Sequence, residues 1–234
     1  MNEAVQKKRA SHARTSDLDA SQARVRPERS RTNNPERTMA EILAVAYTEF
    51  ADKGLAGARI DMIAAATRTS KRMIYYYFGS KEGLYLAVLE GAYRQMREQE
   101  AELQLESLAP MEALVRLVEY TFDHHRLHEN YIRMVMAENI NRGEYLRQSP
   151  YIQDLNVPAI SAIEKLYARG VREKVFRPGL QALDIHAAIS ALTFFNVSNA
   201  HTFGLIFKVD FKDPAMVQHR RACVVDMMVR YLQR

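Results

Sequence analysis

The stretch Ile60–Phe78, IDMIAAATRTSKRMIYYYF, decides the fold of this chain. Its first part carries apolar residues at positions i, i+3 and i+4, the spacing of one helical face: Ile60, Ile63 and Ala64. The apolar spacing stops at the polar residues 67–69. Ser70 follows them, and serine is a residue type that caps helix N-termini through its hydroxyl. The pattern therefore predicts two short helices joined by a tight turn.

The second predicted helix has two unlike faces. One carries apolar and aromatic side chains at helical spacing and should pack on the first helix: Ile74, Tyr77 and Phe78. The other carries two cations and two tyrosines: Lys71, Arg72, Tyr75 and Tyr76. Lys and Arg reach phosphates or guanine edges, and a tyrosine hydroxyl bonds phosphate, so this face suits the major groove of DNA. The alternative is that all three tyrosines are packing residues.

This region resembles the N-terminal domain of TetR-type transcriptional regulators. The resemblance covers about a quarter of the chain and rests on Phe50, Gly54, Ile63, Ala64, Ser70, Ile74, Tyr75, Phe78, Ser80, Lys81 and Glu82. It implies a dimeric, all-helical, ligand-responsive DNA-binding protein, most often a repressor. We therefore predict a site for double-stranded DNA made of Arg59, Thr69, Ser70, Lys71, Arg72, Tyr75, Tyr76 and Lys81.

Four positions depart from the family pattern. Arg68 stands where the turn usually has glycine, and Arg59 where a capping Ser or Thr is common. Arg72 replaces a small residue, and Met73 replaces a frequent threonine. A non-glycine residue in a left-handed turn costs about 1–2 kcal/mol. Either Arg68 bears that strain or the turn is built differently.

After Phe78, the sequence GSKEGLY predicts the start of another helix with Ser80 as its cap. The free N–H groups and the positive dipole end of such a terminus attract phosphate, and Lys81 adds a full charge. An apolar face continues this helix: Leu84, Tyr85, Val88, Leu89 and Tyr93. The helix should act as a lever between the DNA-reading helices and the rest of the chain.

Three segments follow from these patterns. Residues 35–82 should form a three-helix, helix-turn-helix DNA-binding domain, whose first helix begins at Pro35 and ends at Gly54. Residues 83–234 should form a larger helical ligand-binding and dimerisation domain, because no strand-like alternation persists after residue 91. Residues 1–34 should be a disordered basic tail, either without a role or as an arm that touches DNA. The predicted fold class is all-α.

The net charge of +5 is distributed unevenly. Residues 1–34 hold eight Lys/Arg and four Asp/Glu, residues 35–85 hold seven and six, and the remainder holds eighteen of each. The excess therefore lies at and before the predicted DNA reader. A membrane-surface patch is the other meaning of a basic end, but no apolar face accompanies it. One cysteine and no visible secretory segment predict a cytoplasmic protein.

The segment 187–207 has no Asp, Glu, Lys or Arg and is long enough to span a bilayer. Polar residues in its middle would be costly there, so we predict no membrane span. The segment should instead belong to a long helix, 184–207. Together with the last helix, which opens at Pro214, it should form a four-helix bundle in a homodimer. Two-fold symmetry then predicts a palindromic operator with half-sites about one turn of DNA apart.

Asn196, Asn199 and His201 lie in this most apolar stretch and must be paired. They should pair with one another, across the dimer, or with a small effector. Arg133 lies among apolar residues and is a candidate anion anchor in the same pocket, which suggests an organic acid. The alternative for Arg133 is a cation at the helix rim, solvated or paired with Glu138.

Catalytic and metal chemistry find little support. His124 and His128 beside Asp123 could share a metal, but no fourth ligand is placed, and a polar helix end is the alternative. Phosphate-loop, dinucleotide and nucleophile-elbow motifs are absent, so we predict no enzyme, no metal and no cofactor. The predicted function is a ligand-released repressor. Its alternatives are an activator on the same scaffold and a helical ligand-binding or scaffold protein with an incidental basic end.

Overall fold

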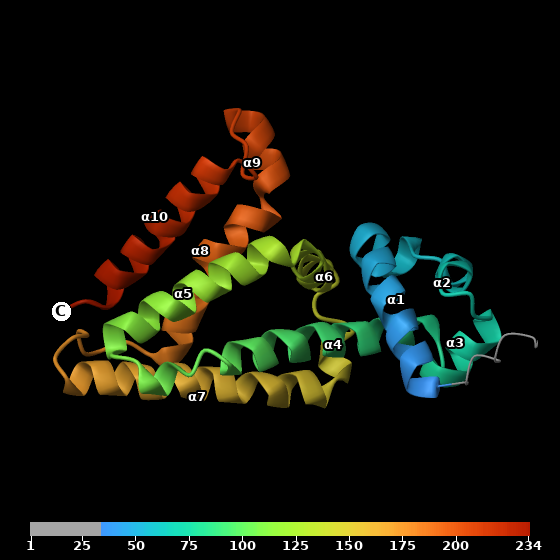
Figure 1. Cartoon of the computed structure of the whole chain (residues 1–234), viewed down its shortest axis with the longest axis horizontal. Coiled ribbons are helices and arrows are strands. Elements are labelled where there is room, and N and C mark those ends of the chain that lie inside the picture. Colours follow the sequence, from blue (N-terminus) through green and yellow to red (C-terminus); the bar gives the residue numbers. More distant parts are fainter. Residues whose placement is uncertain (1–33) are drawn as a thin grey trace, which may run out of the picture. The chain divides into compact units, whose positions relative to one another are not determined.

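The computed structural model describes residues 34–234, which form ten α-helices and two short 3-10 helices (Figure 1). The predicted tail, residues 1–34, lies outside the described residues apart from Asn34. The helices are α1 (Pro35–Gly57), α2 (Ile60–Ala66), α3 (Lys71–Phe78), α4 (Lys81–Ala101), η1 (Leu105–Ser107), α5 (Pro110–Leu127), α6 (Glu129–Ile140), η2 (Leu146–Gln148), α7 (Pro150–Arg172), α8 (Ala182–Ser198), α9 (Ala200–Phe207) and α10 (Pro214–Leu232). The all-α prediction is confirmed.

The first three helices enclose a core that also includes the start of α4. Its most buried side chains are fully or almost fully removed from solvent: Ile42, Ala46, Phe50, Ile63, Ile74, Leu84 and Tyr85. The predicted caps are present, because the Ser70 hydroxyl accepts the Met73 N–H at 3.2 Å and the Ser80 hydroxyl accepts the Gly83 N–H at 3.0 Å. These caps fix where α3 and α4 begin.

Gly54 interrupts α1, as its predicted role as a helix end requires. Its backbone has φ 65° and ψ 174°, a conformation that favours glycine, and a last turn to Gly57 follows. The ring of Phe50 then meets the ring of Tyr85 edge-on, with centroids 5.1 Å apart. Helix α4 is thereby packed against α1.

A second core lies between α5, α7, α8 and α10. Its buried members come from all four helices: Leu114, Leu117, Val118, Ile163, Leu166, Ile185, Ile189, Val224 and Met228. Residues 35–234 form one compact unit. The predicted division at residues 82 and 83 therefore stays a prediction.

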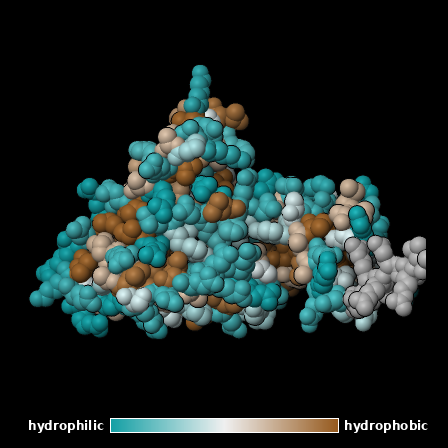
Figure 2. Space-filling model, viewed as in Figure 1, coloured by the Kyte–Doolittle hydropathy of each residue, from teal (hydrophilic) through white to brown (hydrophobic). Residues whose placement is uncertain are grey.

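The predicted single helix 184–207 is wrong, because the structure divides it into α8 and α9. Asn199 has φ −106° and ψ 2°, and its N–H bonds to Phe195 O and Val197 O. Helix α9 buries none of its residues, and Leu205 and Ile206 are 83% and 70% exposed. Hydrophobic residues are visible at this end of the molecule (Figure 2). Among residues 34–234, no helix combines the length and apolar character needed to cross a bilayer.

A close approach at Gly170 offers a test of the second core. A Cβ atom at this position would lie 2.0 Å from the ring of Phe176, which is 1% exposed. Gly170→Ala should therefore lower the free energy of unfolding by about 1–3 kcal/mol, as overpacking does. Urea denaturation would measure the change. The control is Gly91→Ala in α4, where nothing lies within 4 Å of the added atom. An equal loss in both variants would contradict the close contact.

Candidate DNA interface and regulatory region

The outward face of α3 is arranged as the sequence pattern predicts. Ile74 is fully buried, and Tyr77 and Phe78 pack against the core. Lys71 and Arg72 are exposed, and Tyr75 and Tyr76 are 43% and 77% exposed. Two cations and two tyrosine hydroxyls thus share one surface of a short helix, the residue types that bond phosphates and base edges. These four residues define what we call the reader face.

The other predicted DNA-binding residues flank the reader face, and three of them use their polar groups locally. The guanidinium of Arg59 pairs with Asp61, Nη2 to Oδ2 at 2.7 Å, and this hydrogen bond lowers the pKa of the Asp61 carboxyl. The Lys81 ammonium donates to the Ala56 carbonyl at 3.3 Å. Ser70 caps α3, and Thr69 is half-buried.

The turn between α2 and α3 is left-handed at Arg68, with φ 51°. Of the two possibilities open from the sequence, the structure therefore has the strained one, at a cost of about 1–2 kcal/mol. The turn is held by backbone hydrogen bonds, Arg68 N–H to Ala65 O at 3.2 Å and Thr69 N–H to Ala64 O at 3.0 Å. The exposed side chain of Arg68 adds a further cation beside α3.

Helix α6 is hydrogen-bonded to both α1 and α4, which share a core with α3, the helix that carries the reader face. Arg133 Nε donates to Ala51 O at 2.8 Å, and its Nη2 donates to Asp52 O at 3.2 Å. The buried Glu138 carboxylate accepts the Tyr85 hydroxyl at 3.0 Å through one oxygen and the Leu146 N–H at 2.9 Å through the other. A movement of α6 would therefore act directly on the helices that support α3.

The predicted effector residues do not form one group. Asn196 and His201 line the same cavity of about 290 Å³, together with Arg126 and Lys212. Asn196 already uses both ends of its amide, since its oxygen accepts from Arg220 at 2.9 Å and its nitrogen donates to Leu192 O at 2.7 Å.

Two of the predicted effector residues lie apart from this cavity. The Asn199 amide donates to the Ser198 hydroxyl at 2.8 Å. Arg133 does not share the cavity, because main-chain carbonyls of α1 hold its guanidinium. Its expected place beside Asn196 is corrected accordingly, and its partner is not Glu138 either.

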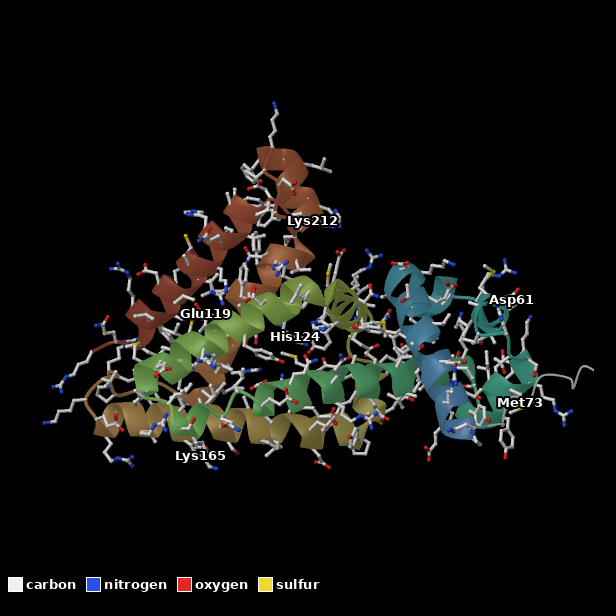
Figure 3. All side chains as sticks on the ribbon, viewed as in Figure 1. Asp61, Met73, Glu119, His124, Lys165 and Lys212 are labelled. Carbon is white, nitrogen blue, oxygen red and sulfur yellow. The ribbon has the colours of Figure 1, made fainter. Side chains whose placement is uncertain are left out.

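A buried polar cluster between α4 and α5 is the feature that sequence reasoning missed. It contains Arg97 and Glu100 of α4, which form an ion pair, and His124 and His125 of α5, which are 4% and 3% exposed. Figure 3 places His124 on the side of α5 nearest α4. The helical spacing of residues 124, 125 and 128 was visible in the sequence, but their burial was not.

Burial keeps both histidines uncharged at neutral pH. Desolvation lowers the pKa of His124 to about 4 and that of His125 to about 3, and nearby positive groups, including Arg97, add to both shifts. The rings of His124 and His128 stack with centroids 4.2 Å apart, and His128 Nδ1 lies 2.9 Å from His124 O. Within the described part of the chain, no three potential metal-binding side chains gather.

Two family models match the chain. The model described as "Bacterial regulatory proteins, tetR family" matches residues 42–88. The model described as "Tetracyclin repressor-like, C-terminal domain" matches residues 110–228, which is half of the chain.

Named relatives agree with these matches. The HTH-type transcriptional repressor NicS of Pseudomonas putida is 31% identical over 204 residues, which is 87% of this chain and 96% of the relative. The HTH-type transcriptional repressor SCO4008 of Streptomyces coelicolor is 34% identical over 110 residues, or 47% of this chain and 54% of the relative.

Solved structures share the fold. The putative transcriptional regulator SCO4942 from Streptomyces coelicolor has a TM-score of 0.63 at 26% identity, covering 83% of this chain and 98% of its own. KstR2 of Mycobacterium tuberculosis, described as a ketosteroid transcriptional regulator, has a TM-score of 0.64 at 20% identity, covering 87% and 97%. The second likeness is one of fold alone.

Proposed function

Because this chain belongs to the TetR family of bacterial regulatory proteins, we propose that the reader face on α3 binds operator DNA and that binding represses transcription. The exposed side by side placement of Lys71, Arg72, Tyr75 and Tyr76 carries the proposal. Ser70 and Lys81, at the N-termini of α3 and α4, supply phosphate contacts next to them, with Arg59 and Thr69 at the edge. The named relatives are repressors, which favours repression over activation on the same scaffold.

The second part of the proposal is a cytoplasmic homodimer. Helices α8, α9 and α10 expose large apolar side chains: Leu183, Phe195, Leu205, Ile206, Phe207 and Met227. Exposed apolar side chains on these three helices suit an interface between proteins. A two-fold dimer through these helices sets two reader faces side by side, so the operator should be palindromic.

The third part is release by a small molecule. The effector must bind the DNA-free arrangement more tightly than the DNA-bound one, because only a difference in affinity shifts the equilibrium. The hydrogen bonds of Arg133 and Glu138 connect α6 to α1 and α4, and through them effector binding can move the reader face. We propose an organic acid as the effector. The cavity beside Asn196 and His201, with Arg126 and Lys212 around it, is one site for it.

A fluorescence anisotropy titration against DNA from beside the gene, at two salt concentrations, tests the proposal. We expect tight binding that competitor DNA does not remove and that weakens steeply with salt. Binding should saturate at two chains per palindromic operator. A helical scaffold protein with an incidental basic end would bind DNA weakly, and competitor DNA of any sequence would displace the operator equally well. Absence of binding at low salt would remove the regulator proposal.

A further inference from the structure

The seven cations of residues 35–82 differ in whether the protein pairs them. Three form ion pairs with carboxylates, at 2.7–2.9 Å: Arg37–Glu41, Lys53–Glu49 and Arg59–Asp61. A fourth, Lys81, donates to the Ala56 carbonyl. Within residues 34–234, the side chains of the other three, Arg68, Lys71 and Arg72, form no ion pair or hydrogen bond, and all three are exposed. The cations without a protein partner therefore lie on the reader face and in the turn before it.

Arg68 is the exposed residue of the turn between α2 and α3. Thr67 and Thr69, on either side of it, are half-buried, and the Thr67 hydroxyl donates to Ile63 O at 2.8 Å. The backbone hydrogen bonds of the turn hold Arg68 at φ 51°. Its guanidinium is thus the charged group that this turn presents to solvent.

Positive φ alone does not distinguish Arg68 from other residues. Among residues 34–234, four further non-glycine residues share it: Gln104, Arg142, Lys174 and Lys208. Each of these side chains costs folding stability that glycine would not cost, because its Cβ crowds the backbone. What distinguishes Arg68 is its place, two residues before the serine that caps the helix of the reader face.

This place puts Arg68 beside the DNA backbone when α3 lies in the major groove. A helix of this kind reads bases with its first residues. Three peptide units separate Arg68 from Lys71, the first residue of α3, so their Cα atoms lie within about 11 Å of each other. The major groove is about 12 Å wide, and the phosphate backbones form its walls. The turn therefore lies next to one wall, where a guanidinium can bind a phosphate through two N–H groups.

We infer that Arg68 binds a backbone phosphate of the operator through its guanidinium, so that the turn gives up folding stability in exchange for DNA affinity. This inference rests on the proposed function and adds to it a residue that lies outside the predicted DNA site. A phosphate carries no base sequence, so the contact should strengthen binding to every duplex alike. A homodimer makes the contact twice.

Arg68→Gly in the full chain tests the inference, because it removes the charge and the strain together. In anisotropy titrations it should bind DNA from beside the gene, and a random duplex of equal length, about tenfold more weakly, since each of the two copies loses an exposed ion pair that contributes about threefold. The slope of log K against log salt should fall in magnitude by about 1.8, at about 0.9 for each contact. The urea midpoint should rise, because glycine adopts a positive φ without a Cβ clash. Arg68→Lys keeps the charge and should keep the salt slope.

The matched control is Lys174→Gly. Lys174 follows α7, is exposed and has φ 60°, so this variant removes the same charge and the same kind of strain more than a hundred residues further along the chain. It should raise the urea midpoint similarly and leave DNA binding unchanged.

Four results would overturn the inference: Arg68→Gly binds both duplexes as the parent chain does, it weakens binding to only one of them, its urea midpoint falls, or Lys174→Gly weakens binding equally. The preference of the parent chain for DNA from beside the gene over the random duplex tests the proposed function separately.

Discussion

Replacing Lys71 and Arg72 together by alanine should lower the affinity for operator DNA by about a hundredfold or more. Each side chain is exposed on the reader face, and a good charged contact with a base edge contributes about 1–3 kcal/mol. Two such losses total about 2–6 kcal/mol, and about 2.8 kcal/mol corresponds to a factor of one hundred. Each phosphate contact that is lost should also reduce the salt dependence by about 0.9 in the slope of log K against log salt. Anisotropy titrations over a series of salt concentrations would measure both effects.

The matched control removes two positive charges elsewhere. Arg116 in α5 and Arg172 at the end of α7 are both exposed, so Arg116→Ala with Arg172→Ala changes the net charge equally. This variant should bind the operator nearly as tightly as the parent. If both double variants lost the same affinity, net charge and not the reader face would carry DNA binding. Circular dichroism should show unchanged helical content in both, because neither pair contributes to a core.

Acidification should destabilise the protein steeply between pH 6.5 and pH 4. The pKa values of His124 and His125 lie near 4 and 3 in the folded chain because both are buried, against 6.5 for a free histidine. The unfolded chain therefore binds more protons in this range, so their contribution is complete above pH 6.5 and is lost as the pH falls. The slope should approach about 1.4 kcal/mol per pH unit for each histidine. Urea denaturation at half-unit pH steps would measure it.

Other titratable groups near the two histidines also affect how the free energy of unfolding depends on pH. Burial also lowers the pKa of His186 of α8, which adds to the loss, and the positive charge of Arg97 contributes to all three shifts. Burial raises the pKa of Glu100, so this carboxyl takes up its proton earlier in the folded chain and partly offsets the loss.

Variants of the histidines separate this effect from general acid denaturation. His124→Gln with His125→Gln should flatten the profile between pH 6.5 and pH 4. His219→Gln changes an exposed histidine of α10 and should leave the profile as it is. A flat profile in the parent chain, or the same slope in the double variant, would show that the buried histidines do not set the acid sensitivity.

The helices α1 to α3 and the start of α4 were largely predictable because their determinants are local. Helical periodicity alone separates the buried Ile74 from the exposed Tyr75 and Tyr76. Serine hydroxyls placed before Lys71 and Lys81 mark where two helices begin, since a cap acts within three residues. The positive φ of Arg68 was also one of the two possibilities that the sequence left for this turn.

The later helices were less predictable because their contacts connect distant segments of the chain. Arg133 bonds carbonyls that lie 81 and 82 residues earlier in the chain, and every residue has such a carbonyl. Arg97 pairs with Glu100 through Nη1 while its buried Nε has no hydrogen-bond partner, which no spacing reveals. The break at Asn199 ends an apolar run that has no proline or charge to mark it. Hydrophobic pattern alone predicts one helix there.

The hydrogen bonds from Arg133 to α1 have a consequence for how such proteins diversify. Both hydrogen-bond acceptors, Ala51 O and Asp52 O, are main-chain atoms, and the Asp52 carboxylate, 3.8 Å from Arg133 Nη2, adds a side-chain contact with α1. Mutations that give α2 and α3 a new target sequence therefore leave the attachment to α6 intact. Selection can thus retune which genes are controlled without rebuilding the sensor.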